Sequence, residues 1–253
     1  MFGQTGVGKS SIVNLIAGKH VAKVSGDAMG CTMSSTEYQF TVGPHHFRIW
    51  DTVGLEEPVL GVNGYFAAIV KSLWLIRKVA SAGGVDLLLF CMPGNRITRT
   101  AQCNYRLFHE MFCEKKVPIG MVITFLEREK NMEDWWTRNE KRINDFGMKS
   151  IGHACVSASS HPNHVKKYTL SRAAIYGLLT DCDPLGRYTA TPNTWFKRLL
   201  RNMKSLVDGK LPKGEKLTQA LMVRGGLSEE DAKRLRKHFE DPLPEEGPFV
   251  DLE

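Results

Sequence analysis

Apolar segments with the periods of strands and helices alternate along the chain as far as residue 182. Residues 36–42 alternate apolar and polar side chains, which is typical of a half-buried strand, and residues 46–50 predict a second strand that pairs with the first as a hairpin. Further buried strands are predicted from apolar runs at residues 85–92, 119–125 and 153–158. Helices are predicted from apolar spacing at residues 12–16, 67–80, 99–113, 133–146 and 171–179.

This alternation predicts an α/β fold, a three-layer sandwich around a mostly parallel sheet. Proline and glycine punctuate the chain from about residue 183. Residues 195–207 there predict a basic amphipathic helix, and Ser228 predicts the N-cap of another helix. We therefore expect one domain over residues 1–182 and a helical C-terminal extension over residues 183–253.

The first ten residues contain a complete GxxxxGK[ST] motif, which is typical of a P-loop that binds nucleoside triphosphates. Its glycines allow successive backbone N–H groups to point at phosphate oxygens, and the helix that follows presents its positive end to the same anion. Lys9 is expected to reach the β- and γ-phosphates, and the Ser10 hydroxyl to coordinate Mg²⁺. The predicted phosphate-binding residues are Gly3, Gln4, Thr5, Gly6, Val7, Gly8, Lys9, Ser10 and Ser11.

Only Met1 and Phe2 precede this motif, whereas a buried strand normally leads into a P-loop. A strand needs about five residues. We therefore expect the first, central strand of the sheet to be largely missing and the chain to be shortened at its N-terminus.

A second motif, Asp51-Thr52-Val53-Gly54, directly follows a predicted strand. Asp51 is expected to hold Mg²⁺ through water, and the Gly54 backbone N–H to contact the γ-phosphate and act as a hinge. A polar segment at residues 26–35 lies between the two motifs, and Thr32 is the candidate in it for a further Mg²⁺ ligand. Ser34, Ser35 and Thr36 are the alternatives.

With these motifs the chain resembles the translation-factor-related P-loop GTPases. It is similar in detail to the branch that includes septins, plastid import receptors and immune-associated GTPases, and most similar to fungal G-domain-containing proteins. The resemblance covers residues 1–182 and rests on residues 2–11, 30–32, 51–55, 96–98, 104–108 and 135–136. It implies GTP or GDP and Mg²⁺ as cofactors.

The segment that reads the base departs from the usual pattern. After the strand at residues 119–125, GTPases have an Asn/Thr-Lys-x-Asp box, and this chain has Thr124-Phe125-Leu126-Glu127. The Glu127 carboxylate can replace the aspartate, because it accepts hydrogen bonds from guanine N1–H and N2–H, and Phe125 can stack on the base in place of the lysine. A solvated charge run is the alternative for Glu127. Ser157 and Ala158 match the loop that backs the base.

Catalysis is expected to be slow, because Leu55 stands where small signalling GTPases have a glutamine that orients water. The resemblance implies that Arg96 reaches across a homodimer of G domains, and a loop arginine in a salt bridge is the alternative. Lys9, Thr32 and Arg96 are therefore the catalytic candidates. The predicted function is a Mg²⁺-dependent GTPase switch. A nucleotide-gated scaffold with little turnover and a P-loop ATPase are the alternatives.

The net charge of +7 and the pI near 9.1 permit contact with nucleic acid or anionic lipid but do not require it, so no nucleic-acid partner is expected. The six cysteines form no CxxC pair, which favours a reducing, cytoplasmic setting. The helix at residues 195–207 is expected to pack on its own domain, with peripheral membrane contact as the alternative. Trp135 and Trp136 are expected to be packed by the C-terminal extension, with an exposed contact surface as the alternative.

Overall fold

The computed structural model describes residues 1–4, 6–22, 35–42, 44–52, 79, 82–106, 108–109, 113, 115–159 and 161–181, with short pieces between residues 214 and 236. The predicted helix at residues 67–80 falls almost entirely outside these residues, and the helix at residues 195–207 falls wholly outside them. Thr5, Thr32, Gly54 and Leu55 also lie outside the described residues. The division of the chain at residue 182 therefore stays a prediction.

Three parallel strands form the centre of the fold, in the order β3 (Leu88–Pro93), β4 (Ile119–Thr124) and β5 (Gly152–Cys155). The predicted hairpin is also present, as β1 (Ser35–Val42) paired antiparallel with β2 (His45–Thr52). Its register places Tyr38 opposite Ile49. The α/β class with parallel strands, predicted from the apolar runs, is confirmed.

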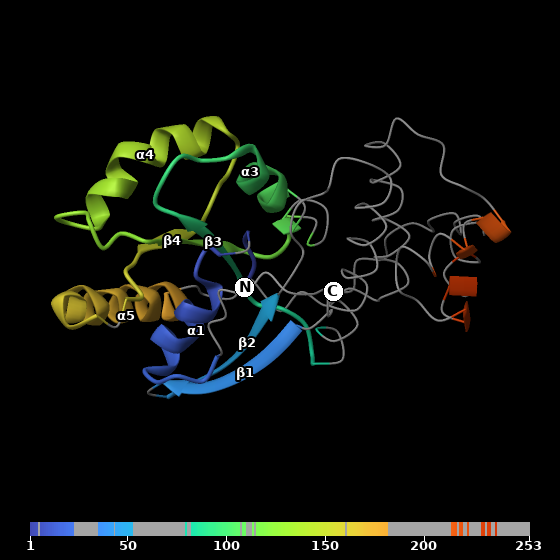
Figure 1. The fold of residues 1–253 in the computed structure, drawn as a ribbon, viewed down its shortest axis with the longest axis horizontal. Coiled ribbons are helices and arrows are strands. Elements are labelled where there is room, and N and C mark those ends of the chain that lie inside the picture. Colours follow the sequence, from blue (N-terminus) through green and yellow to red (C-terminus); the bar gives the residue numbers. More distant parts are fainter. Residues whose placement is uncertain are drawn as a thin grey trace, which may run out of the picture.

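Met1 and Phe2 lie between the hairpin and the parallel strands. The Met1 ammonium group donates to the Trp50 carbonyl at 2.8 Å, and Thr52 N–H donates to the Met1 carbonyl at 3.2 Å. On the other side Phe2 N–H donates to Leu89 O at 2.9 Å, and Cys91 N–H donates to Phe2 O at 2.8 Å. These two residues occupy the position expected for the central strand and join β2 to β3 (Figure 1).

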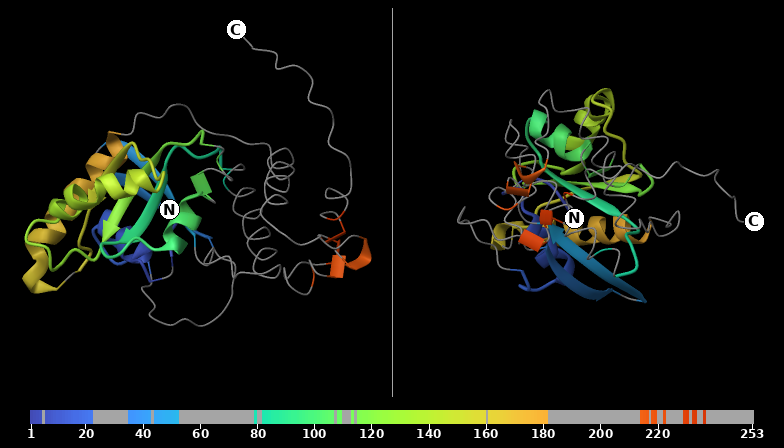
Figure 2. Two further views of the ribbon diagram at one scale, coloured as in Figure 1. Left: turned by 90° about the horizontal axis from the view of Figure 1, so that it is seen from above. Right: turned by 90° about the vertical axis from the view of Figure 1, so that its right-hand side faces the viewer.

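Helices cover both faces of the strands. They are α1 (Lys9–Ala17), α3 (Arg99–Tyr105), α4 (Glu133–Asp145) and α5 (Val165–Thr180), with a short 3₁₀ turn, η2 (Pro162–His164), before α5. In Figure 1, α3 and α4 lie on one side of the strands and α1 and α5 on the other. In both views of Figure 2, α1 and α5 remain neighbours, in agreement with their contacts.

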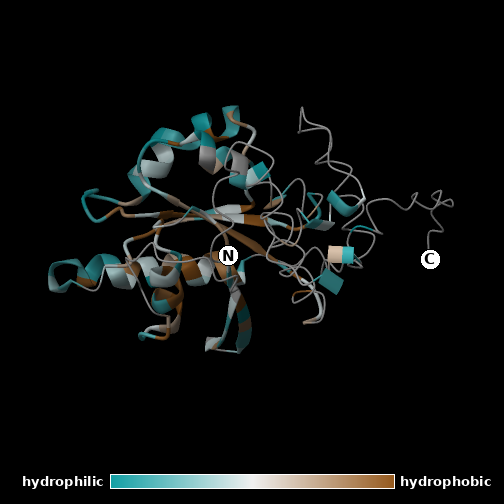
Figure 3. Ribbon diagram, turned by 45° about the vertical axis from the view of Figure 1, so that its right-hand side comes forward, coloured by the Kyte–Doolittle hydropathy of each residue, from teal (hydrophilic) through white to brown (hydrophobic). Residues whose placement is uncertain are grey.

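The alternation of side chains along the strands divides the core into two clusters. Phe90 and Met92 pack on the side of α3 and α4, whereas Leu89 and Cys91 pack on the side of α1. Both faces are apolar because helices cover both, as expected for parallel strands. Figure 3 shows the same distribution, with hydrophobic residues on the strands and mostly hydrophilic ones on the outer helix α4.

Some element boundaries differ from those predicted. Helix α5 begins at Val165 rather than at residue 171, because Pro162 and the 3₁₀ turn start the helix earlier. The apolar residues Val165 and Leu170 are exposed, so apolar spacing does not indicate this first part of the helix. Strand β5 ends at Cys155, three residues earlier than predicted, where the chain turns into a polar loop.

Both tryptophans of the pair at residues 135–136 are buried, Trp135 at 4% and Trp136 at 8% exposure. The alternative of an exposed contact surface is wrong for both rings. The Trp136 ring stacks on His153 of β5, with ring centres 3.9 Å apart. Within the described part of the chain, no helix is long and apolar enough to cross a membrane.

Candidate functional site

The loop from Gly3 to Gly8 follows Phe2, which pairs with β3, and leads directly into α1. Gly6 and Gly8 have φ angles of 73° and 87°, and Gly8 forms the N-cap of α1 without any side-chain cap. At Gly3 the chain passes so close to β3 that an added Cβ would lie 2.2 Å from the Cys91 carbonyl oxygen. Among the described residues the first N–H groups of α1 have no side-chain acceptor, so they can bind an anion.

Lys9 lies across this loop. The residue is 8% exposed, and its Nζ atom donates to the carbonyl oxygens of Gly3 at 3.0 Å and Gln4 at 2.9 Å. The ammonium group is thus held over the loop as a buried positive charge. Such a charge favours the arrival of a phosphate anion.

Ser10 and Asp51 meet beside the loop, as predicted for a magnesium site. The Ser10 hydroxyl donates to Asp51 Oδ2 at 3.3 Å. Asp51 is 2% exposed, and its Oδ1 atom is buried without a hydrogen-bond partner among the described residues. Mg²⁺ prefers oxygen ligands and keeps several waters. A hydroxyl beside a carboxylate with one unsatisfied oxygen fits this ion.

Burial raises the pKa of the Asp51 carboxyl above its ordinary value, against the lowering effects of the Met1 ammonium group, Lys9 and the Ser10 hydrogen bond. Burial likewise lowers the pKa of the Met1 ammonium group. The carboxylate therefore pays a desolvation cost that a bound cation would offset.

Thr124 connects the P-loop to the segment after β4. Its buried hydroxyl donates to Val7 O at 2.8 Å and also lies 3.3 Å from Met92 O. The next residue, Phe125, has a φ angle of 61° and a 52% exposed side chain. Its Cζ atom would lie 3.7 Å from a Cβ added at Gly8, so the ring borders the P-loop.

Glu127 and Ser157 also come together, although 30 residues separate them. The Ser157 hydroxyl donates to Glu127 Oε1 at 3.2 Å. Ser157 is fully buried, and Ala158 beside it is half-buried. The contact favours an ordered carboxylate over a solvated charge run.

Helix α5 forms hydrogen bonds to the two segments that contain the base-binding candidates Glu127 and Ser157. The sequence did not predict these contacts. Lys167 Nζ donates to the carbonyl oxygens of Glu127, at 2.6 Å, and of Glu129. The Ser171 hydroxyl accepts from Ser157 N–H at 2.8 Å. Lys167 lies outside the predicted helix, and nothing in its local pattern distinguishes it from a solvated lysine.

The remaining candidates contribute less to this geometry. Gln4 and Ser11 are half-buried at the loop and in the first turn of α1. Arg96 is exposed in the connection between β3 and α3. For Thr5, Thr32 and Gly54 the predicted roles stay predictions.

Residues 1–125 match the family model described as 50S ribosome-binding GTPase. The chain contains a P-loop GTPase domain of this family. The resemblance to P-loop GTPases, first drawn from the motifs, is thereby confirmed. Comparison with curated proteins found no match.

Several solved structures share the fold of this GTPase. A dimerization-deficient mutant of Toc33 from Arabidopsis thaliana is 20% identical, with a TM-score of 0.51 over 72% of this chain and 84% of that one. A variant of Era from Aquifex aeolicus bound to GDP.AlF4⁻ is 14% identical, with a TM-score of 0.51 over 94% and 86%. Era in complex with MgGDPNP and a segment of 16S ribosomal RNA is 13% identical, with a TM-score of 0.52 over 94% and 83%. At these identities the likeness concerns the fold.

Replacing Asp51 by Asn is expected to reduce the gain in nucleotide affinity that Mg²⁺ provides by roughly 10- to 100-fold, because a charged acceptor is lost.

Without nucleotide and Mg²⁺, the same replacement is expected to change the stability of the folded protein in a way that depends on pH. The folded pKa of Asp51 is raised, so its contribution to stability is complete below the ordinary value of 3.8 and is lost as the pH rises through the raised pKa. The stability of Asp51→Asn relative to wild type should therefore increase with pH, as measured by urea unfolding.

Asp134→Asn, at an exposed aspartate in the first turn of α4, is the control for the magnesium effect. It should leave the Mg²⁺ dependence unchanged. An Asp51→Asn protein that binds Mg²⁺-nucleotide as tightly as wild type would refute the assignment of Asp51.

Proposed function

We propose that this GTPase domain binds GTP with Mg²⁺, hydrolyses the β–γ bond slowly, and acts as a switch through residues 26–36 and 51–64. One observation carries the proposal: the Thr124 hydroxyl ties the P-loop to the segment that ends at Glu127. Hydrogen bonds thus hold both ends of the short segment 124–127, to the P-loop at Thr124 and to Ser157 at Glu127.

The phosphate end relies on main-chain groups and on Lys9. The N–H groups at the start of α1 and the Lys9 ammonium group stabilise the β- and γ-phosphate oxygens, including the charge that develops as the β–γ bond breaks. Ser10 and Asp51 would hold Mg²⁺, which neutralises phosphate charge when it is bound.

The base end relies on Glu127. One of its oxygens accepts from Ser157, and this contact holds the carboxylate in place for a nucleobase. Guanine presents N1–H and N2–H side by side, whereas adenine has no such donor pair. The exposed Phe125 ring beside Gly8 supplies an apolar surface for the base or the ribose, where GTPases usually have a lysine stem.

Lys9→Ala is expected to lower the affinity for GTP by roughly 100-fold or more, because the buried cation at the phosphates is removed. Titration with a fluorescent guanine nucleotide measures this loss. Lys141→Ala, at an exposed position on α4, is the matched control and should bind like wild type. Unchanged affinity in Lys9→Ala would contradict the P-loop assignment.

Glu127→Gln is expected to weaken GTP binding by roughly 10- to 100-fold and to leave ATP binding almost unaltered, because only guanine uses the carboxylate. Competition of GTP and ATP against the same fluorescent nucleotide gives both affinities. Glu129→Gln is the control, since that carboxylate is paired with Arg138 at 2.6 Å. If ATP displaces the fluorescent nucleotide from the wild-type protein as well as GTP does, the assignment of Glu127 as the guanine reader fails and the ATPase alternative is favoured.

Pairing of two G domains belongs to the same proposal. Arg96 is exposed after β3, and the Toc33 structure is that of a dimerization-deficient mutant, so dimerisation is a property of that neighbour. We infer that Arg96 of one protomer reaches the nucleotide of another and stabilises charge on its phosphates.

Single-turnover GTP hydrolysis per protomer should therefore rise with protein concentration, and Arg96→Ala should remove the rise. Arg99→Ala, at the start of α3 and also exposed, should keep it. A rate per protomer that does not depend on concentration rejects the pairing. Absence of hydrolysis at every concentration favours the scaffold with little turnover.

A further inference from the structure

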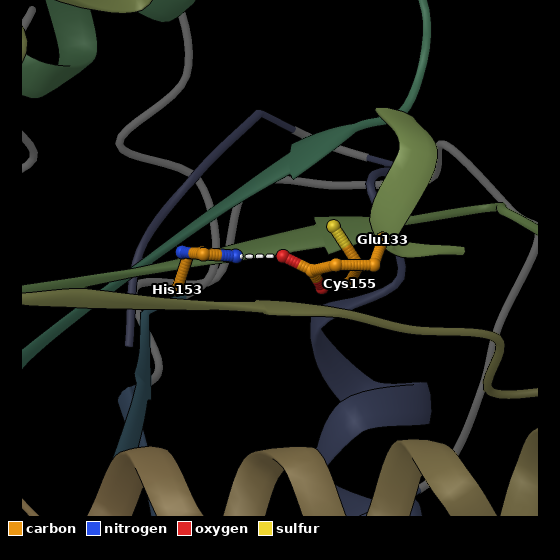
Figure 4. Close-up of side chains that lie close together, drawn as sticks. All are labelled: Glu133, His153 and Cys155. Atoms are coloured by element: carbon orange, nitrogen blue, oxygen red, sulfur yellow. Dashed lines mark hydrogen bonds and ion pairs between the residues drawn. The ribbon is translucent and has the colours of Figure 1, made fainter. Parts of the chain in front are cut away.

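Three side chains of different chemistry converge where α4 meets β5. Glu133 is the first residue of α4, and His153 and Cys155 lie two residues apart on the same face of β5. Their ligand atoms all lie within 4.8 Å of one another. Figure 4 shows the Glu133 carboxylate pointing toward the His153 ring, with the Cys155 sulfur beside it.

The surrounding residues orient this cluster. The Trp136 ring stacks on the His153 imidazole with an angle of 5° between the planes, and His153 Nε2 forms a hydrogen bond with Glu133 Oε1. The histidine therefore presents one nitrogen to the centre of the cluster. A ring held by stacking loses little freedom when that nitrogen binds a ligand.

The cluster is exposed to solvent at Glu133 and His153. The side chains of Glu133 and His153 are 53% and 25% exposed, whereas Cys155 is 3% exposed behind them. A small ion can thus enter past the carboxylate and meet the sulfur at the base of the cluster.

The first turn of α4 acts on the ionisation of the Cys155 thiol in both directions. A backbone hydrogen bond from Trp136 to Cys155 favours the ionised sulfur, as does the positive end of the helix. Burial and the Glu133 charge nevertheless raise the pKa of Cys155 to about 12. Both effects that oppose ionisation, burial and a neighbouring negative charge, are offset by a bound divalent cation.

A thiol, an imidazole and a carboxylate are the ligand types that Zn²⁺ combines, often with three protein ligands and one open position. Mg²⁺ prefers oxygen alone, so it does not suit this set. In tetrahedral zinc sites, bonds of about 2.0 to 2.3 Å place ligand atoms roughly 3.3 to 3.8 Å apart. Rotation of the exposed Glu133 side chain can bring its carboxylate within that range of the His153 nitrogen and the Cys155 sulfur, which themselves lie within 4.8 Å of each other.

We propose that Glu133, His153 and Cys155 form a zinc-binding site, with water as the fourth ligand. Zinc takes the place of the direct contact between Glu133 and His153. The Cys155 proton passes to solvent as the zinc–sulfur bond forms. The proton that His153 Nε2 donates to Glu133 leaves as the zinc–nitrogen bond forms, to Nδ1 of a neutral ring or to solvent from a protonated one, so charge and atoms balance. The bound ion ties the start of α4 to β5, two residues before Ser157.

The test uses the full chain without nucleotide, in excess Mg²⁺, titrated with Co²⁺ as a spectroscopic substitute for zinc and then with Zn²⁺. Wild type should bind one Co²⁺ per chain with a sulfur-to-cobalt charge-transfer absorption, and Zn²⁺ should displace it. Saturating Zn²⁺ should also raise the melting temperature by several degrees. Both readouts are independent of GTP binding.

Cys155→Ala should abolish the charge-transfer absorption, and Cys113→Ala, which removes another buried thiol, should keep it. His153→Phe preserves an aromatic ring against Trp136 but removes the nitrogen ligand, and should weaken Co²⁺ binding by at least tenfold. This variant carries the test even if Cys155→Ala does not fold. The proposal is overturned if wild type shows no saturable Co²⁺ or Zn²⁺ binding, or if His153→Phe binds as tightly as wild type.

Discussion

The main-chain pairing of Met1 and Phe2 is the interaction on which the rest of the structure depends. Four hydrogen bonds join these residues to β2 on one side and to β3 on the other. The Phe2 ring, which is 1% exposed, stacks on Phe90 and Phe108 in the core. Because Phe2 is fixed in this way, Gly3 must pass against the Cys91 carbonyl, and only a residue without a Cβ fits there. The position of the P-loop follows from that contact.

The same packing explains why the charges of the site are buried. Lys9 and Asp51 lie beside a loop that is pressed against β3, and water has little access to them. Each charge loses solvation, and neither finds a full set of partners among the described residues, as the unpaired Asp51 oxygen shows. A phosphate and a divalent cation would supply the missing partners. The site thus gives up some stability of the free domain in return for affinity, a compromise common in binding sites.

The sequence predicted those parts of the molecule that short-range patterns encode. The alternation in residues 36–50 predicted the hairpin, and the motifs predicted that Ser10 and Asp51 meet. The start of α5 and the role of Lys167 were missed, because exposed apolar residues blur the helix and a lysine that binds carbonyl oxygens looks like any surface lysine. Trp135 and Trp136 were expected to be packed and both are buried, but the stacking of Trp136 on His153 joins two layers, which no local pattern contains. Contacts between residues 20 or more positions apart, such as Glu133 with His153, need the fold itself.

Strand β5 brings two different chemistries close together without mixing them. His153 and Cys155 face α4 and offer nitrogen and sulfur, whereas the next loop presents the Ser157 hydroxyl to Glu127. The magnesium candidates Ser10 and Asp51 offer only oxygen and belong to α1 and β2. Ligand preference therefore sorts the ions, since a hard cation takes the oxygen pair and a borderline-soft cation takes the set with sulfur. A zinc ion between α4 and β5 would then act on nucleotide binding only mechanically, by holding the strand whose next residues place Ser157 beside the base-reading carboxylate.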